Sequence, residues 1–247
     1  MDKFPKEFSD LLTPRGRRIL EGAEPGACAR FRDPRDYFVT LRGVVGRERA
    51  DGCMALLDRG LYGALEDYRR RIPPDSITKM KRAYSETLGK TIRFKTAFLR
   101  RRTARSYRAA ERTGLLWMLR SESFVRFAEA VTGLRLAREW DLQVICYGHG
   151  DYVGPHNDHH PDVESLRDGF VDFHLMFAND AVAHQYLVYE ERGHLSQMVN
   201  VNLQGGVSVY RLPFWHYTTP LWGKPRREAE ARRWLLLGTF QIEGGQK

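Results

Sequence analysis

Apolar residues in the first part of the chain recur at the spacing of helices. Between residues 51 and 71 they stand three or four positions apart, which places them on one helical face. These positions are Met54, Leu57, Leu61, Leu65 and Tyr68. The sequence Pro-Pro-Asp-Ser at 73–76 then breaks the pattern. We therefore expect a helix within 51–71 that ends before these prolines.

Two more helices are predicted before residue 140. The arginine-rich stretch 94–120 predicts one of them. The other begins near Ser121 or Ser123, either of which can cap a helix, and it ends at Gly133. Its apolar face consists of Phe124, Phe127, Ala128 and Val131. Residues 1–139 are therefore predicted to be mainly helical.

The pattern changes near residue 140, where short runs typical of β-strands follow one another between turn residues. The runs are 142–148, 170–177, 184–190, 197–203, 207–210, 214–219 and 234–242. A short extended piece at 156–158 brings the total to about eight strands, the number expected of a closed or sandwiched antiparallel sheet such as a jelly roll. Helices and strands in separate blocks disfavour an alternating α/β fold. The expected class is α+β, with a jelly-roll core at 140–247 and a helical region at 1–139 that packs against it.

The charge of the chain divides at nearly the same place. Residues 1–140 carry 31 Lys and Arg against 18 Asp and Glu, whereas residues 141–247 carry 9 against 13. The densest basic segment is 69–112, with 15 Lys and Arg and three acidic residues. The two regions therefore have different surfaces, which suggests different tasks.

Composition limits the class and the compartment. Apolar residues make up 42% of the 247 and charged residues 29%, as in soluble globular proteins. The apolar stretches are too short to cross a bilayer, and the charged N-terminus lacks the apolar region of a secretory signal. The three cysteines are far apart in sequence, which disfavours a disulfide framework and a cysteine zinc site. We expect a cytoplasmic protein with no membrane partner.

The candidate chemistry lies in His156-Asn157-Asp158 and in the distant His216. On an extended segment, residues two apart project from the same face, so His156 and Asp158 can bind one ion together. A histidine from a later strand completes a set of two imidazoles and one carboxylate. This facial triad is typical of non-haem iron(II) oxygenases, and it leaves metal positions open for other ligands.

The triad belongs to a longer pattern. Tyr147 is followed by Gly150 three residues later, and His156 and Asp158 come six and eight residues after that glycine. Further segments are the apolar run 175–180 ending in Asn-Asp, His216 with Pro220, the Arg233-Trp234 pair and the helix 124–133 ending in Thr-Gly. Over residues 120–243 the chain thus resembles the prolyl-4-hydroxylase-like branch of the 2-oxoglutarate/iron(II) oxygenase superfamily.

This resemblance implies a double-stranded β-helix and an iron(II)- and 2-oxoglutarate-dependent dioxygenase. His156, Asp158 and His216 would be the catalytic metal ligands. With dioxygen, such an enzyme converts 2-oxoglutarate to succinate and carbon dioxide and hydroxylates an aliphatic C–H bond. Halogenating relatives have a small residue in place of the aspartate, so Asp158 favours hydroxylation.

Arg233 and Tyr147 are the candidate ligands of the cosubstrate. The distal carboxylate of 2-oxoglutarate must be buried, and a guanidinium binds a carboxylate through two parallel hydrogen bonds. Strand alternation places Arg233 and Leu235 on one face and Arg232 and Trp234 on the other. The family motif has its arginine directly before the aromatic residue, so we predict Arg233 rather than Arg232, with the Tyr147 hydroxyl on the same carboxylate.

The sequence departs from the family at two places. His184-Gln185 replaces the usual Gly-Gly after Asn-Asp, and a polar insertion at 224–232 lengthens the stretch before Arg233. We interpret His159 and His160 as supporting or solvent-facing residues, and we do not expect His184 to reach the metal. The histidines expected to make ordinary hydrogen bonds are His149, His174 and His194.

Several alternatives stay open. A hydrolytic zinc site can also use two histidines and a carboxylate, but it does not explain Tyr147 or Arg233. The basic segment also suits a nucleic-acid-binding protein, or an oxygenase that modifies nucleic acid. Its aromatic residues Phe94, Phe98 and Tyr107 are few for a base-stacking surface, so we favour a small-molecule or peptide substrate. A positive surface beside the iron would steer an anionic or carrier-bound substrate, and the candidates are an amino acid, a peptide and an acidic metabolite.

Overall fold

The computed structural model describes residues 1–24, 29, 31, 33, 36–72, 90–158, 166, 169–191 and 194–243. Within these ranges a large antiparallel sheet runs in the order β1-β10-β6-β13-β4-β3-β5-β11-β8-β9, with β2 paired to β3 and a small separate β7–β12 pair. The strands are β1 (Phe38–Leu41), β2 (Glu66–Arg71), β3 (Thr91–Phe98), β4 (Asp141–Tyr147), β5 (Tyr152–His156), β6 (Phe170–Ala178), β7 (Val182–His184), β8 (Tyr186–Glu191), β9 (His194–Asn200), β10 (Gly206–Leu212), β11 (His216–Thr218), β12 (Trp222–Gly223) and β13 (Arg233–Gln241).

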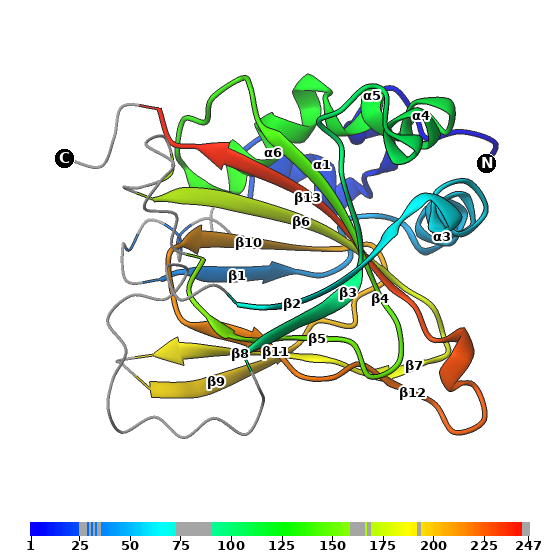
Figure 1. Cartoon of the computed structure of the whole chain (residues 1–247). Coiled ribbons are helices and arrows are strands. Elements are labelled where there is room, and N and C mark those ends of the chain that lie inside the picture. The colour runs from blue at the N-terminus through cyan, green and yellow to red at the C-terminus, as the bar shows by residue number, and fades with distance from the viewer. Residues whose placement is uncertain are drawn as a thin grey trace.

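The large sheet folds into two layers (Figure 1). Strands β1, β10, β6, β13 and β4 form one layer, and β5, β11, β8 and β9 form the other. Strand β3 pairs with both β4 and β5, so it joins the two layers along one side. This arrangement is the predicted double-stranded β-helix, and the prediction of an α+β jelly-roll fold is confirmed.

Helices cover the outer face of the first layer (Figure 1). The helical elements are η1 (Phe8–Leu11), α1 (Pro14–Leu20), α3 (Arg47–Gly60), η2 (Tyr62–Ala64), α4 (Arg105–Arg112), α5 (Leu115–Leu119), α6 (Glu122–Thr132) and η4 (Glu228–Glu230). Among the described residues, every helix is too short or too polar to cross a lipid bilayer.

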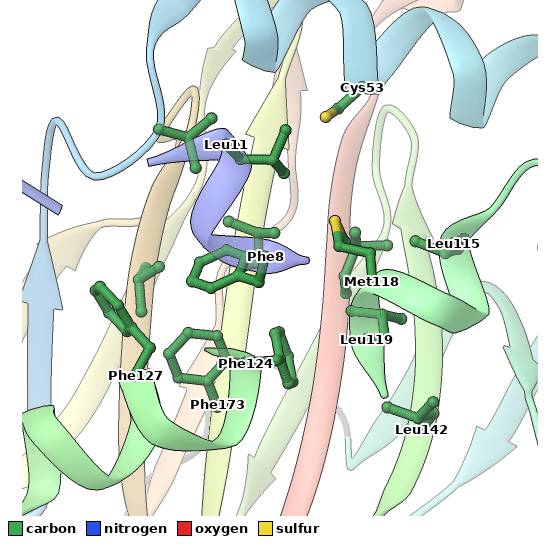
Figure 2. Close-up of a cluster of buried hydrophobic side chains, with 14 of the residues drawn as sticks. Phe8, Leu11, Cys53, Leu115, Met118, Leu119, Phe124, Phe127, Leu142 and Phe173 are labelled. Carbon is green, nitrogen blue, oxygen red and sulfur yellow. The ribbon is translucent and has the colours of Figure 1, made fainter. Parts of the chain in front are cut away.

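Aromatic side chains hold the helices on the sheet. Phe173 of β6 meets Phe8, Phe124 and Phe127 edge-on, with ring centroids 6.1, 4.8 and 5.8 Å away (Figure 2). Such edge-to-face pairs combine burial of large apolar rings with favourable ring electrostatics. Because successive strand residues face opposite sides, the neighbouring His174 points into the space between the two layers. The helices thus fix the outer face of a strand whose inner face lines a cavity.

Most elements agree with the sequence patterns. Seven of the eight extended runs predicted after residue 140 overlap a strand, namely β4, β6, β8, β9, β10, β11 and β13, whereas the short piece at 156–158 shares only His156 with β5. Helix α6 follows Ser121 directly and is terminated by Gly133, whose φ of 69° lies in the left-handed region that glycine adopts without strain. The loop at 73–76 lies outside the described residues.

The helical predictions for 51–71 and 94–120 are wrong in part. Helix α3 ends at Gly60, and residues 66–71 form the edge strand β2. Residues 91–98 form β3, because they pair with both β4 and β5, and the helices α4 and α5 begin only after it. Strands β1, β2 and β3 thus enter the main sheet from before residue 140, whereas the division of the chain at 140 into two regions stays a prediction.

Candidate active site

A cavity of about 1060 Å³ lies between the two layers. The inward-facing residues of both layers line it, from Arg233 and Tyr147 to Asp141 and Gln241. The register of the β13–β4 pair sets the order of residues along one wall of the cavity. Arg233 is paired with Tyr147 at one end of this wall, and Thr239 is paired with Asp141 at the other. The volume is in the upper range of small-molecule sites in proteins.

The three predicted metal ligands meet at this cavity. His156 ends β5 and His216 begins β11, and the two are register partners in the antiparallel pair. Their ring centroids are 4.4 Å apart. One oxygen of Asp158 lies 3.2 Å from Nε2 of His156, and the other lies 3.4 Å from Nε2 of His216. One potential ligand atom from each residue thus lies within 4.8 Å of the other two.

Asp158 reaches this position by a route that differs from the predicted one. The expectation of a continuous extended segment is wrong, because β5 stops at His156 and Asp158 has a φ of 50°. Aspartate enters this left-handed region more readily than most residues with a side chain. The turn brings the carboxylate back toward the two imidazoles, so the chain bend, rather than strand alternation, completes the triad.

Backbone hydrogen bonds orient both imidazoles. Nδ1 of His156 donates to the carbonyl of Gly154 at 2.7 Å, and Nδ1 of His216 donates to the carbonyl of Phe214 at 2.9 Å. Because a carbonyl only accepts, Nδ1 of each ring carries a proton, and in the neutral form of each ring the lone pair of Nε2 points at the centre of the triad. Two neutral imidazoles and a carboxylate, arranged in this way, fit iron(II).

The electrostatics of the two histidines differ. Burial, and next the neighbouring His156, lower the pKa of His216 to about 3. Burial also opposes a charge on His156, but the Asp158 carboxylate and its hydrogen bond outweigh burial and raise the pKa of His156. His216 is therefore held in the neutral form that binds metals. At His156 a metal ion would take the place of a proton beside Asp158.

Arg233 is buried at the inner end of the cavity, with only 1% of its surface exposed. Its guanidinium donates to the carbonyl of Val201 at 2.8 Å, to Oε1 of Gln185 at 3.0 Å and to the sulfur of Met176 at 3.2 Å. Burial lowers its pKa. Within the described part of the chain no carboxylate forms an ion pair with this guanidinium. A buried cation with neutral partners alone is a site for an anionic ligand.

Strand alternation separates Arg233 from Arg232, as predicted. Arg233, Leu235 and Leu237 face the cavity, whereas Trp234 packs on the helical side. The guanidinium of Arg232 lies 4.5 Å above the ring of Tyr62, and it donates to the carbonyls of Ala229 and Glu230. Arg232 therefore points away from the triad.

Tyr147 stands beside Arg233 on the same wall. The two residues are register partners, and the guanidinium lies 5.4 Å from the centre of the tyrosine ring. Burial raises the pKa of Tyr147 to about 12, although the charge of Arg233 and a hydrogen bond with Thr218 oppose the shift. The hydroxyl is therefore protonated at neutral pH, and it is a hydrogen-bond donor next to a buried cation.

Gln185 is a site residue that the sequence did not identify. It is fully buried, and its amide nitrogen donates to the carbonyls of Thr219 at 3.1 Å and Asp151 at 3.4 Å. These bonds fix the amide so that Oε1 faces Arg233. The only signal in the sequence was the replacement of the family's Gly-Gly by His184-Gln185. Gln185 supports the guanidinium on the side away from the cavity.

Removing this support is expected to cost stability. A Gln185→Leu variant leaves one guanidinium donor of Arg233 and the carbonyl of Thr219 without their partner, whereas the Asp151 carbonyl keeps the N–H of Leu221. Each unsatisfied buried group costs about 1–3 kcal/mol. We expect the free energy of unfolding in urea to fall by at least about 2 kcal/mol. Gln143→Leu, which loses one partly buried hydrogen bond to Thr96, is the matched control. Equal losses in the two variants would contradict the role of Gln185.

The other histidines occupy varied positions. His149 accepts a hydrogen bond from the backbone of Gly223, as expected. His184 packs against Tyr186 and Trp222 and does not line the cavity. The expectation for His174 is wrong, because this residue lines the cavity and its Nδ1 is buried without a hydrogen-bond partner among the described residues. His159 and His160 lie outside the described residues.

Comparison with known proteins identifies the fold. The sequence matches no protein-family model and no curated protein. In structure, an oxidoreductase of the 2OG-Fe(II) oxygenase family from Burkholderia pseudomallei aligns with 91% of this chain and 93% of its own, with a TM-score of 0.59 and 16% identity. The epimerase SnoN, solved with Fe³⁺, alpha ketoglutarate and nogalamycin RO, aligns over 90% and 84%, with a TM-score of 0.53 and 14% identity.

A prolyl hydroxylase from Trichoplax adhaerens, in complex with a peptide fragment of the hypoxia inducible factor, gives a third match. It covers 93% of this chain and 94% of its own, with a TM-score of 0.51 and 12% identity. These structural neighbours are thus an oxidoreductase of the 2OG-Fe(II) oxygenase family, an epimerase in complex with Fe³⁺ and alpha ketoglutarate, and a prolyl hydroxylase. The chain therefore has the fold of the 2-oxoglutarate/iron(II) oxygenase superfamily, as the resemblance in its sequence predicted.

Proposed function

We propose that this chain is an iron(II)- and 2-oxoglutarate-dependent dioxygenase that hydroxylates an aliphatic C–H bond. His156, Asp158 and His216 bind the metal, and Arg233 and Tyr147 bind the distal carboxylate of 2-oxoglutarate. The observation that carries the proposal is the buried Arg233, which has no carboxylate partner among the described residues and lies in the same cavity as the triad. The shared fold supports it.

The chain's own residues would bind and orient the reactants. When bound, iron and 2-oxoglutarate supply the oxygen activation that yields succinate and carbon dioxide and adds one oxygen atom of dioxygen to the substrate. With Nδ1 fixed by a backbone carbonyl, Nε2 of each histidine would bind the metal ion together with Asp158. Arg233 and Tyr147 orient the cosubstrate by its far end. Val153, Ile145 and Leu235 form an apolar wall that excludes water from this inner end.

Loss of the tyrosine hydroxyl is expected to weaken cosubstrate binding moderately. Tyr147→Phe removes one hydrogen bond to the carboxylate, worth about 0.5–1.5 kcal/mol. The dissociation constant for 2-oxoglutarate should therefore rise roughly two- to tenfold, since 1.4 kcal/mol corresponds to a factor of ten. Tyr62→Phe, on the outer side of the sheet near Arg232, is the control. Unchanged 2-oxoglutarate affinity in Tyr147→Phe would contradict the assigned contact.

The basic segment adds a proposal about the substrate. Strands β2 and β3 lie beside the cavity, and Tyr68, Phe94 and Arg100 contribute to its lining. Arg69, Arg70 and Arg71 are exposed on β2, as are Arg100, Arg101 and Arg102 after β3. Lys79 to Arg82 lie outside the described residues. We propose that this surface steers an anionic or carrier-bound substrate toward the metal.

Nucleic acid is the second candidate partner, and the aromatic residues of this segment give it little support. Phe94 is buried and packs against Tyr68 and Tyr147. Of the three aromatics considered, Phe98 alone is an exposed large apolar residue. Base-stacking surfaces of single-strand binders need several such faces. Strong, salt-sensitive retention of RNA or DNA without turnover of 2-oxoglutarate would favour the nucleic-acid candidate.

Salt dependence tests the steering proposal. For the best substrate found, kcat/KM of the wild type is expected to fall steeply as salt rises, because salt screens surface charges over about 10 Å at 0.1 M. An Arg100/Arg101/Arg102→Ala variant should show a flatter profile. Arg15/Arg17/Arg18→Ala removes the same charge from α1 and should match the wild type. Flat, equal profiles for all three proteins would mean that the basic segment is only a solvated surface.

Substrate-dependent turnover tests the proposed function as a whole. Protein loaded with iron(II) without oxygen is mixed with 2-oxoglutarate, air and a panel of amino acids, peptides and acidic metabolites. We expect one panel class to stimulate succinate formation with matched formation of a hydroxylated product. Stimulated succinate formation without hydroxylation would keep the cosubstrate chemistry and exclude the hydroxylase assignment. Absence of succinate with every member would count against the dioxygenase.

A further inference from the structure

Two polar residues of β6, Asp172 and His174, face the same cavity as the triad. Strand alternation explains their direction, because Val171, Phe173 and Leu175 belong to the apolar cluster under the helices. In register, Asp172 lies between Tyr210 of β10 and Thr239 of β13. The pair thus lies farther from Arg233 along the wall, toward the end marked by Asp141.

Both residues have buried polar atoms that lack a partner. Asp172 and His174 are 8% and 7% exposed. Oδ1 of Asp172 and Nδ1 of His174 make no hydrogen bond within the described part of the chain. Their other polar atoms face each other, with Oδ2 of Asp172 3.9 Å from Nε2 of His174. A buried polar atom without a hydrogen bond costs about 1–3 kcal/mol, so a cavity lined by two such atoms indicates a ligand that supplies the missing bonds.

The position of this pair places that ligand near the metal ligands. The ring of Tyr210 contacts His174 on one side, with centroids 4.3 Å apart, and His216 on the other, 5.5 Å apart. One aromatic ring therefore separates the pair from the distal histidine of the triad. Arg233, which we assign to the binding of 2-oxoglutarate, is paired with Ala178 of β6. Ala178 lies four residues after His174 on the same strand. The pair is therefore positioned to contact the substrate rather than the cosubstrate.

We propose that Asp172 and His174 form a subsite that binds a hydrogen-bond donor of the substrate, either a hydroxyl or an ammonium group. This inference rests on the proposed function and specifies its substrate. An ionised carboxylate only accepts hydrogen bonds. Nε2 of His174 lies 3.9 Å from this carboxylate, whose negative charge favours a proton rather than a lone pair on Nε2, and a proton there leaves Nδ1 as a second acceptor. Two neighbouring acceptors fit a diol or an amine, and they repel a carboxylate or phosphate.

The subsite also limits how an anionic substrate can lie. A negative group of the substrate would have to avoid Asp172 and face the basic residues outside it. Arg100 and Arg120 line the same cavity near Asp141. A substrate with a donor at one end and an anionic group at the other would satisfy both surfaces. The donor would be held near the metal, and the anionic end would point toward the basic residues.

Small probes test the subsite without knowledge of the substrate. Binding of butylamine, 1,2-butanediol and 1,2-dimethoxyethane to the metal-free full chain is measured from NMR chemical shifts. The diether matches the diol in chain length but has no donor. We expect at least one donor probe to bind tenfold or more tightly than the diether. Preference for the amine over the diol would assign an ammonium group, and the reverse preference a hydroxyl.

Variants connect this selectivity to the two residues. Asp172→Leu should remove the preference for donor probes, and the conservative Asp172→Asn should weaken butylamine at least tenfold through loss of the charge. His174→Gln should weaken the diol. Asp141→Asn, a partly exposed carboxylate elsewhere in the cavity, should change none of these affinities. Thermal melting of each variant shows whether it is folded. If Asp172→Leu does not fold, Asp172→Asn is the variant that tests the carboxylate.

Two results would overturn the subsite. One is equal binding of all three probes, or binding of none, by the wild type. The other is unchanged selectivity in folded Asp172 and His174 variants. Iron-dependent binding of 2-oxoglutarate is measured in the same preparations. If 2-oxoglutarate does not bind but the probes keep their selectivity, the result counts against the dioxygenase and keeps the subsite. If 2-oxoglutarate binds in an iron-dependent way but the probes show no selectivity, the result counts against the subsite alone.

Discussion

His156→Ala and His216→Ala variants are expected to lose stoichiometric iron(II) binding and all 2-oxoglutarate turnover. Each histidine would supply one of three protein ligands, and its Nε2 is already oriented by a backbone carbonyl. Changes to residues that merely support a metal ligand cost roughly 10–100-fold in affinity or activity. Loss of a ligand itself should therefore exceed about 100-fold. Iron content after anaerobic loading and succinate formation are the two measurements.

A matched control separates loss of the metal from loss of the fold. His149→Ala removes a histidine that accepts a backbone hydrogen bond and does not line the cavity, so it should keep iron binding and turnover. Full activity in either His156→Ala or His216→Ala would exclude the proposed triad. An Asp158→Ala variant that turns over with chloride would be compatible with the same metal site.

Arg233→Ala is expected to have the largest effect on the cosubstrate. The substitution removes the cationic partner of a buried carboxylate, and truncation of such a pair costs roughly 2–5 kcal/mol. The dissociation constant for 2-oxoglutarate should rise from about 30-fold to several thousandfold, since each 1.4 kcal/mol is a factor of ten. Calorimetric titration of 2-oxoglutarate into the metal-loaded protein measures this change.

Two companion variants sharpen the test. Arg232→Ala removes a half-buried arginine whose guanidinium lies over Tyr62 on the other side of the strand, so 2-oxoglutarate affinity should stay near the wild-type value. Arg233→Lys keeps the charge but loses the planar arrangement of donors, and it should restore affinity only in part. A large effect from Arg232→Ala with a silent Arg233→Ala would show that the assignment of the two faces is wrong.

Local sequence patterns predicted the parts of this molecule that depend on local rules. The strands after residue 140 follow from short apolar runs between turns, and α6 follows from its apolar face and Gly133. The face of Arg233 follows from alternation along β13. The grouping of His156, Asp158 and His216 followed from a motif whose spacing resembles a known family, and the three residues meet at the cavity.

Other features depend on contacts between distant segments. The basic residues Arg93 and Lys95 obscured a period of two in 91–98, in which Ile92 and Phe94 line the cavity while Arg93 is exposed. Strand β2 has no apolar alternation of its own, and its pairing with β3 defines it. The left-handed turn at Asp158 has no signal in the sequence beyond the tolerance of aspartate for it.

Gln185 and the Asp172–His174 pair were not predicted from the sequence for the same reason, which is that their roles depend on segments distant in the chain. Gln185 acts through Arg233, which lies 48 positions later in the chain. Asp172 and His174 gain their importance because helices cover the opposite face of β6 and leave these two side chains inside the cavity. A sequence reading can place them on one face of a strand, but only the assembled layers show that this face lines the active site.

Metal-dependent binding of 2-oxoglutarate tests the central proposal most directly, because it requires no substrate. Labelled 2-oxoglutarate is dialysed to equilibrium against the full chain under anaerobic conditions, with and without iron(II). We predict one 2-oxoglutarate bound per chain in the presence of one iron(II), with affinity reduced at least tenfold when the metal is left out or when His216→Ala is used. Equal binding with and without iron, or no binding in either condition, would contradict the assignment of this cavity to a 2-oxoglutarate- and iron-dependent dioxygenase.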